Sequence, residues 1–530
     1  MEINLLDCTM RDGGYVNDWN FGNSIIRYML QRYINSNIEY VEIGFLDERR
    51  EFDSNRTIFP NTESVEKIYG GIDKKKTKLM AMIDYGTCNI DNLDMKSESI
   101  IDGIRIIFKK PNMYNAIDFA KKVLAKGYMV SINMVSITSY EDQDILDFCK
   151  AVNEIKPMAV AIVDTYGLMH KEQMQHYFEL LDHNLAEEIA IGYHSHNNFQ
   201  LAYSNSIEIL NLKTQRTIIL DGSAYGMGKS AGNAPIELLA MHLNDNYKKH
   251  YEVNQILEII DTAIIPIYKR RPWGYSELFY IAALNQCHPN YINFLLDRAT
   301  LSIESINQIA EKIDPDKKLN YDEEYIKKLY QEFQKVRFDD TDTINDLRKK
   351  YSGKPILLLG PGKTISSDKE KIRSYIKDNA IETIAINFIP KEINANTLFI
   401  GNAKRYSALA SEIKQTNIPV IATSNVLSLE SDFKYVINSE TVLDNVDIIS
   451  DNSFAMLLNL LLIIEPSKLI LAGFDGYGYK NENDFYCVES YNLSDNLERL
   501  NLVTMELSKK LKKMKEKLCV EFITCSEYEV

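Results

Sequence analysis

The feature that most constrains this 530-residue chain is a regular alternation that begins at its N-terminus. Between residues 3 and 221, short apolar runs rich in β-branched residues alternate with amphipathic stretches, as when parallel strands are joined by crossover helices. Eight strands are expected, at Ile3–Leu6, Tyr40–Phe45, Lys78–Ile83, Gly103–Phe108, Met129–Val135, Ala159–Val163, Ile189–Tyr193 and Thr217–Leu220. The sequence therefore predicts an N-terminal (β/α)8 TIM barrel, whose active site would lie at the C-terminal ends of the strands.

Metal-binding residue types lie at two of these strand ends. Asp12 follows the first expected strand, and His194 and His196 end the seventh. Two histidines two residues apart on a strand project from the same face, so both imidazoles can reach one ion. A carboxylate with two imidazoles suits a divalent metal. An isolated His-x-His pair is more often two surface or hydrogen-bonded histidines, so the prediction depends on the two further motifs that accompany the pair in the sequence.

Sequence composition and pattern predict four segments along the chain. We expect the barrel domain over residues 1–240, a helical extension flanking the barrel mouth over 241–336, a charged linker over 337–352 and a Rossmann-like α/β domain over 353–530. Helices of the extension are expected at Ile256–Ile265, Ser276–Asn285 and Glu323–Lys335. Strands of the last domain are expected at Lys354–Leu359, Thr383–Phe388, Thr397–Ile400, Pro419–Ala422 and Leu469–Ala472, with a buried helix at Phe454–Ile464. The fold class is therefore α/β throughout.

Charge and cysteine content limit the partners. The net charge of −15 disfavours binding to nucleic acid or to an anionic membrane, so a small-molecule partner is expected. No apolar segment reaches the roughly 18 residues that span a bilayer, and the N-terminus does not resemble a signal peptide. Seven cysteines without a Cys-x-x-Cys pair indicate reduced thiols. These features predict a cytoplasmic protein.

Three motifs in the first 300 residues carry a family resemblance. They are Asp7-x-Thr9-x-Arg11-Asp12-Gly13, His194-x-His196-Asn197 and the run from Gly226 to Pro235, Gly-Met-Gly-Lys-Ser-Ala-Gly-Asn-Ala-Pro. In order and spacing they resemble the DRE-TIM metallolyase superfamily, also called HMGL-like or pyruvate carboxyltransferase domains, and within it most of all the 4-hydroxy-2-oxovalerate aldolases.

The resemblance implies a metal-dependent reaction. Asp12, His194 and His196 would bind Mn²⁺, Mg²⁺ or Zn²⁺, with Asn233 as a further ligand. The ion would chelate a pyruvate-like 2-oxo acid, and Arg11 would be a second cation beside the resulting enolate. The predicted activity is that of a divalent-metal-dependent aldolase, a carbon–carbon lyase or synthase that acts on a 2-oxo acid and an aldehyde. Members of the family often form dimers or larger assemblies, so a homo-oligomer is expected.

The proton-transfer group departs from the aldolase pattern. Tyr15 stands where the aldolases have histidine, and it would be either a base acidified by the metal or Arg11, or a ring that packs on the substrate. Asp7 would be either catalytic or a brace for Arg11. Further candidates for orienting or lining the substrate are Glu42, Asp164, Thr165 and Tyr275.

Two other functions remain open. A Claisen-type acyl-CoA synthase or lyase would use the same enolate, but Ala234-Pro235 resembles the oxovalerate aldolases more than the synthases. The other alternative is a non-catalytic barrel that serves as a scaffold for a sugar-nucleotide-binding C-terminal domain.

A glycine turn opens the C-terminal domain. Gly360-Pro361-Gly362-Lys363-Thr364 fails the P-loop pattern, because Leu357 stands where glycine is needed, and it fails the dinucleotide pattern at Ile365. The turn is either purely structural or an anion or nucleotide site formed by Gly360, Gly362, Lys363 and Thr364. The domain resembles Rossmann-like domains related to bacterial sialyltransferases and flagellin-modifying factors, which implies a nucleotide or sugar-nucleotide ligand and a role in surface-polysaccharide biosynthesis.

Overall fold

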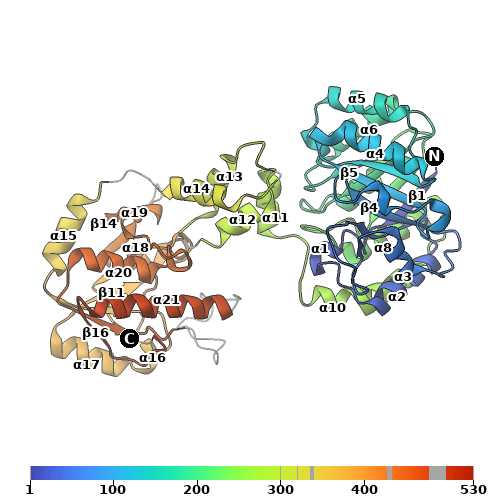
Figure 1. Ribbon diagram of the computed structural model, residues 1–530. Helices are drawn as coiled ribbons and strands as arrows, with labels where there is room; N and C mark the ends of the chain where they lie inside the picture. The colour runs from blue at the N-terminus through green and yellow to red at the C-terminus, as the bar shows by residue number, and fades with distance from the viewer. Residues whose placement is uncertain are drawn as a thin grey trace. The chain divides into compact units, whose positions relative to one another are not determined.

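The computed structural model describes residues 2–298, 300–318, 320–334, 339–426, 433–476 and 497–528. The chain divides into two compact units, Met1–Pro289 and Asn290–Val530 (Figure 1).

The first unit is a closed parallel barrel. Its sheet contains β1 (Ile3–Asp7), β2 (Tyr40–Leu46), β3 (Ile58–Phe59), β4 (Lys78–Asp84), β5 (Gly103–Phe108), β6 (Met129–Met134), β7 (Ala159–Asp164), β8 (Ala190–Ser195) and β9 (Ile218–Gly222). The barrel closes because β1 pairs with β9 on one side, Leu5 opposite Leu220, and with β2 on the other, Leu6 opposite Tyr40. All eight expected strands are present, so the barrel prediction is confirmed; the two-residue β3 is an addition beside β2.

Helices follow the strands around the barrel (Figure 1). They are α1 (Gly14–Asn17), α2 (Asn23–Asn35), α3 (Thr62–Tyr69), α4 (Met113–Ala125), α5 (Asp142–Asn153), α6 (Lys171–Asn184), α7 (Ala202–Ile209) and α8 (Ile236–Tyr247). Local sequence fixes their starts: the Asn61 side chain accepts a hydrogen bond from the Ser64 amide at α3, and Glu141 with Asp144 forms a capping box at α5.

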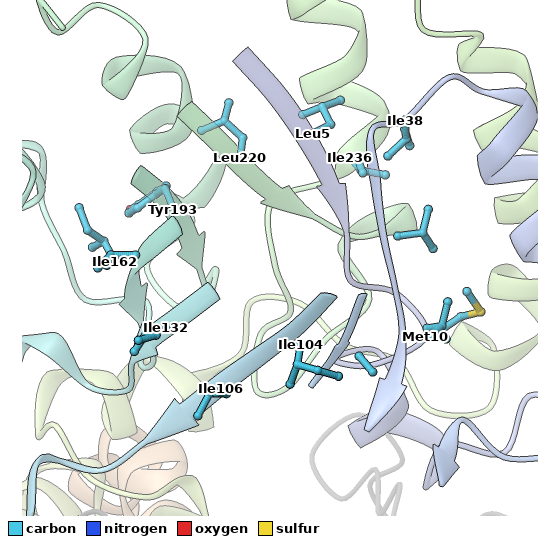
Figure 2. Close-up of a cluster of buried hydrophobic side chains, with 14 of the residues drawn as sticks. Leu5, Met10, Ile38, Ile104, Ile106, Ile132, Ile162, Tyr193, Leu220 and Ile236 are labelled. Carbon is cyan, nitrogen blue, oxygen red and sulfur yellow. The ribbon is translucent and has the colours of Figure 1, made fainter. Parts of the chain in front are cut away.

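The two faces of the barrel strands differ in chemistry. Alternate residues such as Leu5, Ile104, Ile106, Ile132 and Ile162 belong to the large apolar cluster between sheet and helices (Figure 2). The intervening positions form a small second cluster of Leu6, Cys8, Met80, Ala159, Ala190 and Ile219. Further along the same alternation come the buried charged residues Glu42, Arg105 and Asp221. These charged side chains therefore lie on the same face of their strands as the second cluster, nearer to the C-terminal ends of the strands.

The helical region after the barrel is divided between the two units. The first unit contains α9 (Val253–Ile259), a π-helical turn (Ile260–Ile264), α10 (Ile265–Tyr268) and α11 (Glu277–Leu284). From Asn290 onward, α12 (Pro289–Leu296), α13 (Ile303–Glu311) and α14 (Glu323–Gln334) belong to the second unit. Helices are present at all three expected places, although Lys335 lies outside the described residues.

The second unit is built on a second parallel sheet, of order β14-β13-β12-β11-β10-β15-β16. The strands are β10 (Pro355–Leu359), β11 (Glu382–Ile386), β12 (Thr397–Ile400), β13 (Val420–Thr423), β14 (Tyr435–Ile437), β15 (Lys468–Ala472) and β16 (Cys519–Phe522). The helices are α15 (Thr341–Tyr351), α16 (Thr364–Ser367), α17 (Lys369–Asn379), α18 (Ala403–Thr416), α19 (Ser439–Val442), α20 (Ser453–Ile464) and α21 (Leu497–Lys515). The α/β prediction is confirmed; the kinship of this unit to Rossmann-like families stays a prediction.

Two helices of this unit bear on the sequence predictions. Helix α20 is buried along most of its length, as expected for Phe454–Ile464. Part of the expected linker forms α15, because Ile344, Leu347 and Tyr351 recur on one face and pack in the core of the unit. The Tyr351 hydroxyl also lies 2.7 Å from Thr397 Oγ1.

Among the described residues, no helix combines the length and the apolar character needed to cross a membrane. The six described cysteines are free thiols, and Cys487 lies outside the described residues.

Candidate metal centre and active site

Asp12 is fixed in the turn that follows β1. Its Oδ1 accepts a hydrogen bond from Arg11 Nη1 at 2.6 Å. Its Oδ2 accepts bonds from Asn233 Nδ2 at 2.8 Å and from the Lys229 amide at 3.1 Å. Burial alone would raise the pKa of Asp12, but Arg11 and the two site histidines lower it well below its ordinary value. The carboxylate is therefore ionised at neutral pH.

The two histidines lie at the end of β8 and just beyond it. Their ring centroids are 5.2 Å apart and the rings are nearly perpendicular. His194 Nδ1 lies 3.0 Å from Asp221 Oδ2, which leaves the other ring nitrogen for an ion, as is usual for metal-ligating histidines. Burial lowers the pKa of His196 to about 4, so its imidazole is neutral at pH 7 and can act as a ligand.

These residues fit a divalent cation. One ligand atom from each of Asp12, His194 and His196 lies within 4.8 Å of the others. Asn233 Oδ1 is buried without a hydrogen-bond partner in the described chain, so this oxygen lacks the partner that a cation would supply. Gly228 allows this approach, since a Cβ there would lie 2.4 Å from Asn233 Nδ2 and 2.6 Å from Asp12 Oδ2.

Arg11 is held beside the metal ligands. Its Nε donates to Glu42 Oε2 at 2.7 Å, and its guanidinium lies 5.7 Å from the centre of the Phe45 ring. Burial would lower the pKa of Arg11, but the carboxylates of Glu42 and Asp12 raise it above its ordinary value. This hydrogen bond gives Glu42 a way to orient Arg11, in line with the orienting function that the sequence predicts.

Two charged residues that sequence reasoning missed extend this network. Arg105 Nη1 lies 3.2 Å from Glu42 Oε2, and Arg105 Nη2 lies 2.6 Å from Asp221 Oδ2. Burial would raise the pKa of Asp221, but Arg105 and His194 lower it. One sequence feature could have revealed both residues, namely a charge inside or directly after an apolar strand. Arg105 interrupts Gly103–Phe108, and Asp221 follows Thr217–Leu220.

The charges of this buried network do not cancel. The three carboxylates of Asp12, Glu42 and Asp221 face the two guanidiniums of Arg11 and Arg105, which leaves one negative charge next to two histidines. All five side chains are at least 95% buried. A divalent ion would bring this cluster to about +1, a charge that an anionic ligand beside the ion would offset.

Asp7 is also fully buried, but it bonds to a different residue. Its Oδ2 accepts from Thr9 Oγ1 at 2.7 Å, and its Oδ1 accepts from the Thr9 amide at 3.1 Å. Burial raises the pKa of Asp7 to about 7. Among the described ion pairs, Glu42 rather than Asp7 supports Arg11.

A small cavity of about 80 Å³ opens beside the metal ligands. Its walls include Arg11, Asp12, Tyr15, Thr165, His194, His196 and Lys229, together with Asn133 and the apolar Met82, Ile107, Val135 and Val163. Lys229 was noted in the sequence only as part of a motif. Charged and apolar side chains therefore line one small cavity that could hold a ligand.

The remaining candidates of the first unit have different surroundings. Tyr15 is 43% exposed and packs edge-on against Trp19, and burial of its hydroxyl raises its pKa to about 12. Asp164 accepts hydrogen bonds from the amides of Leu168 and Met169, and burial raises its pKa to about 6. Tyr275 is 62% exposed and is not among the residues that line the cavity. The structure thus gathers Tyr15 and Thr165 with the metal ligands but does not bring Tyr275 to them.

The C-terminal glycine turn already holds a carboxylate of the chain. The Thr364 amide donates to Asp475 Oδ2 at 3.0 Å, and the Thr364 hydroxyl bonds Oδ1. A Cβ on Gly362 would lie 2.6 Å from both Asp475 oxygens. Gly360 lies next to Gly473, and Lys363 precedes α16. An anion or nucleotide at this turn stays a prediction, and it would have to displace Asp475.

Comparison with known proteins agrees with the fold of the first unit. Residues 2–263 match the family model described as HMGL-like. An oxaloacetate decarboxylase of Mycobacterium tuberculosis is 25% identical over 274 residues, which cover 51% of this chain and 78% of that protein. A 4-hydroxy-2-oxovalerate aldolase of a Marinomonas species is 26% identical over 216 residues, which cover 39% of this chain and 61% of the aldolase.

Among solved structures, the N-terminal domain of a Bacteroides vulgatus protein is 23% identical, with a TM-score of 0.48 over 57% of this chain and 99% of that one. The family match covers the barrel, all three metal-ligand candidates and Arg11. Residues 2–263 therefore form an HMGL-like domain of the DRE-TIM superfamily, whose members include aldolases and other lyases.

Proposed function

We propose that this protein is a divalent-metal-dependent carbon–carbon lyase of the aldolase type, with a pyruvate-like 2-oxo acid and an aldehyde as the reacting pair. The observation that carries the proposal is the convergence of Asp12, His194 and His196 beside Arg11 on one small cavity. Similarity to an aldolase and a decarboxylase supports it, because the reactions named for both relatives break a carbon–carbon bond of a 2-oxo acid.

The cation would be held by Asp12, His194 and His196, with Asn233 as a further oxygen ligand. When bound, such an ion supplies a Lewis acid for the carbonyl oxygen of the 2-oxo acid. Mn²⁺ is the ion we propose first, and Mg²⁺ and Zn²⁺ suit the same mixed ligand set.

Arg11 would stabilise the negative charge that develops on the substrate. Glu42 and Asp12 fix its Nε and Nη1, while Nη2 has no hydrogen-bond partner among the described residues. A cation held in place before the reaction needs no reorganisation as charge forms, which is the condition for strong electrostatic stabilisation. Arg11 is therefore both preorganised and able to donate to a ligand.

Part of the cavity lining is apolar. Met82, Ile107, Val135 and Val163 present apolar side chains to the cavity. These side chains offer no proton donor to an enolate carbon, so its protonation would come from solvent.

Tyr15 is the proposed contact for the acceptor rather than a base. Its raised pKa of about 12 keeps the phenol protonated at neutral pH, so the hydroxyl can donate a hydrogen bond but cannot accept a substrate proton efficiently. For Tyr15 we therefore propose the substrate-packing alternative, and a base acidified by the bound metal or by Arg11 is the other alternative.

Proton exchange of pyruvate tests the proposal. The full-length protein, loaded with Mn²⁺, Mg²⁺ or Zn²⁺ in turn, is incubated with pyruvate in D₂O, and the methyl signal is followed by proton NMR. We expect metal-dependent loss of that signal with the wild type and with Asp118→Asn, a surface control on α4, but not with Asp12→Asn. Absence of exchange with all three metals would reject enolisation by this protein.

Decarboxylation of a 2-oxo diacid is a second candidate, favoured by the similarity that extends over 78% of the oxaloacetate decarboxylase. It yields the same pyruvate enolate, so pyruvate exchange is expected for both candidates. Carbon dioxide release from oxaloacetate, compared with pyruvate release from 4-hydroxy-2-oxo acids, separates them.

A further inference from the structure

Lys229 is a cation built into the wall of the active-site cavity. Its amide donates to Asp12 Oδ2 at 3.1 Å, so the backbone of this residue is fixed against the metal site. Its side chain lines the same cavity as Arg11, His194 and His196. Its ammonium lies 5.5 Å from the centre of the Tyr15 ring. Lys229 is therefore held at the cavity by its backbone, and its charge lies beside Tyr15.

The ammonium of Lys229 has no carboxylate partner within 4 Å among the described ion pairs. Asp12 is the carboxylate that lines the cavity, and both of its oxygens already accept hydrogen bonds from Arg11, Asn233 and the Lys229 amide. Asp12 and Asp84 attract the charge of Lys229, and Lys109 and Arg11 repel it. The aromatic face of Tyr15 attracts the charge but leaves its N–H donors available. Lys229 can therefore take an anionic ligand.

Charge balance indicates how many negative groups that ligand carries. The buried network of Asp12, Glu42, Asp221, Arg11 and Arg105 has a net charge of about −1, so a divalent cation would bring it to about +1. Lys229 adds one more positive charge in the same cavity. A monocarboxylate would leave one positive charge unmatched, whereas a dicarboxylate would balance the site.

We propose that Lys229 binds the second carboxylate of a compact 2-oxo diacid, whose 2-oxo carboxylate end lies at the metal ligands and Arg11. This inference rests on the proposed function and names its substrate class: the acceptor aldehyde itself bears a carboxylate. The cavity of about 80 Å³ favours a short diacid over an extended one.

The corresponding cleavage breaks the bond between C3 and C4 of a 4-hydroxy-2-oxo diacid. The C4 hydroxyl gives its proton to solvent, its oxygen becomes the carbonyl of the released oxo acid, and the electron pair of the broken bond forms the enolate. Protonation at C3 then gives pyruvate, so the products balance without an oxidant or a reductant. Lys229 holds a carboxylate that takes no part in this step.

The same geometry separates aldol cleavage from decarboxylation. A carboxylate that leaves as carbon dioxide must give up its negative charge, and an ammonium beside it would oppose that loss. Lys229 therefore favours a diacid whose second carboxylate stays intact.

Two matched substrates test the inference in the full-length Mn²⁺-loaded protein. 4-Hydroxy-2-oxopentanoate and 4-hydroxy-2-oxoglutarate differ only in a terminal methyl or carboxylate, and pyruvate release from each is measured by NMR. We expect kcat/KM to be at least about tenfold higher for the diacid, as one charge-assisted hydrogen bond would provide. Equal kcat/KM values, or a preference for the methyl compound, would overturn the inference.

A variant pair assigns the preference to Lys229. Lys229→Met keeps the length of the side chain without its charge, and Lys122→Met removes an exposed charge from α4 as a control. We expect Lys229→Met to lose most of the diacid preference, chiefly through KM, and Lys122→Met to retain it. A preference that survives in Lys229→Met would assign the second carboxylate to another cation and overturn the inference.

Binding gives a readout that does not depend on turnover. Calorimetry with 2-oxoglutarate and 2-oxopentanoate, two five-carbon acids, should show at least about tenfold tighter binding of the diacid by the wild type and near-equal binding by Lys229→Met. Similar affinities in the wild type would overturn the inference even if Lys229→Met were too unstable to purify. If the wild type exchanges pyruvate protons but shows no diacid preference, the proposed function stands and the Lys229 inference fails; absence of exchange rejects the function itself.

Discussion

Arg105 Nη2 lies 2.6 Å from Asp221 Oδ2 inside the barrel, and both side chains are almost fully buried. Asp221 also holds His194, while the other arm of Arg105 faces Glu42, which holds Arg11. One guanidinium thus connects a metal-ligand candidate to the cation proposed to stabilise the enolate. Arg105 and Asp221 therefore help to position both the metal-ligand candidate His194 and, through Glu42, Arg11.

Removal of Arg105 should destabilise the barrel strongly. Arg105→Met leaves Glu42 and Asp221 buried without their shared cation, and breaking a buried pair in this way costs about 3–5 kcal/mol. Hydrogen exchange of the β5 and β9 amides measures the loss. Lys121→Met, which removes an exposed partner of Asp118, should change stability by less than about 1 kcal/mol. Equal effects of the two substitutions would contradict the proposed importance of the network.

Asp221 should tune the metal affinity through His194. Asp221→Asn removes the negative charge that orients and polarises the imidazole, and such changes typically weaken metal binding by about 10- to 100-fold. Titration of the apoprotein with Mn²⁺, followed by calorimetry, measures this. An unchanged dissociation constant in a folded Asp221→Asn protein would show that His194 does not depend on Asp221.

Asp7 should make the stability of the first unit fall as the pH rises. Burial raises its pKa from 3.8 in the unfolded chain to about 7 in the folded one, so the folded state binds the proton more tightly. Its unfavourable contribution therefore grows between about pH 4 and pH 7 and is complete above pH 7. We expect Asp7→Asn to gain melting temperature relative to the wild type at pH 8 but not at pH 4. A constant difference across this range would contradict the raised pKa.

Gly228 should tolerate no side chain. In Gly228→Ala the added Cβ would meet Asp12 Oδ2 and Asn233 Nδ2 at 2.6 and 2.4 Å, so both side chains must move. Since small displacements of positioned groups cost about 100-fold in rate, we expect Mn²⁺ affinity and pyruvate exchange to fall together by at least about tenfold. Loss of exchange with unchanged Mn²⁺ affinity would place the effect outside the metal site.

The sequence predicted the barrel well because buried parallel strands appear as continuous apolar runs, and each of the eight lies between amphipathic stretches. It also predicted Asp12, His194 and His196, since strand ends converge in a barrel whatever the loop details. It did not predict Arg105 and Asp221, because a single charge within an apolar run has no partner until the strands are paired. Lys229 was missed as a site residue for a similar reason: the charge has meaning only once the loop folds against Asp12. In the expected linker, three apolar residues at helical spacing were hidden among charges, and they form α15.

Anomalous diffraction from crystals of the full-length protein grown with Mn²⁺ shows most directly whether Asp12, His194 and His196 bind a metal ion. We expect a peak within about 2.0–2.3 Å of an Asp12 oxygen and of one ring nitrogen from each of His194 and His196. A Mn²⁺ peak held by other residues, or no peak between these three side chains at saturating Mn²⁺, would contradict it.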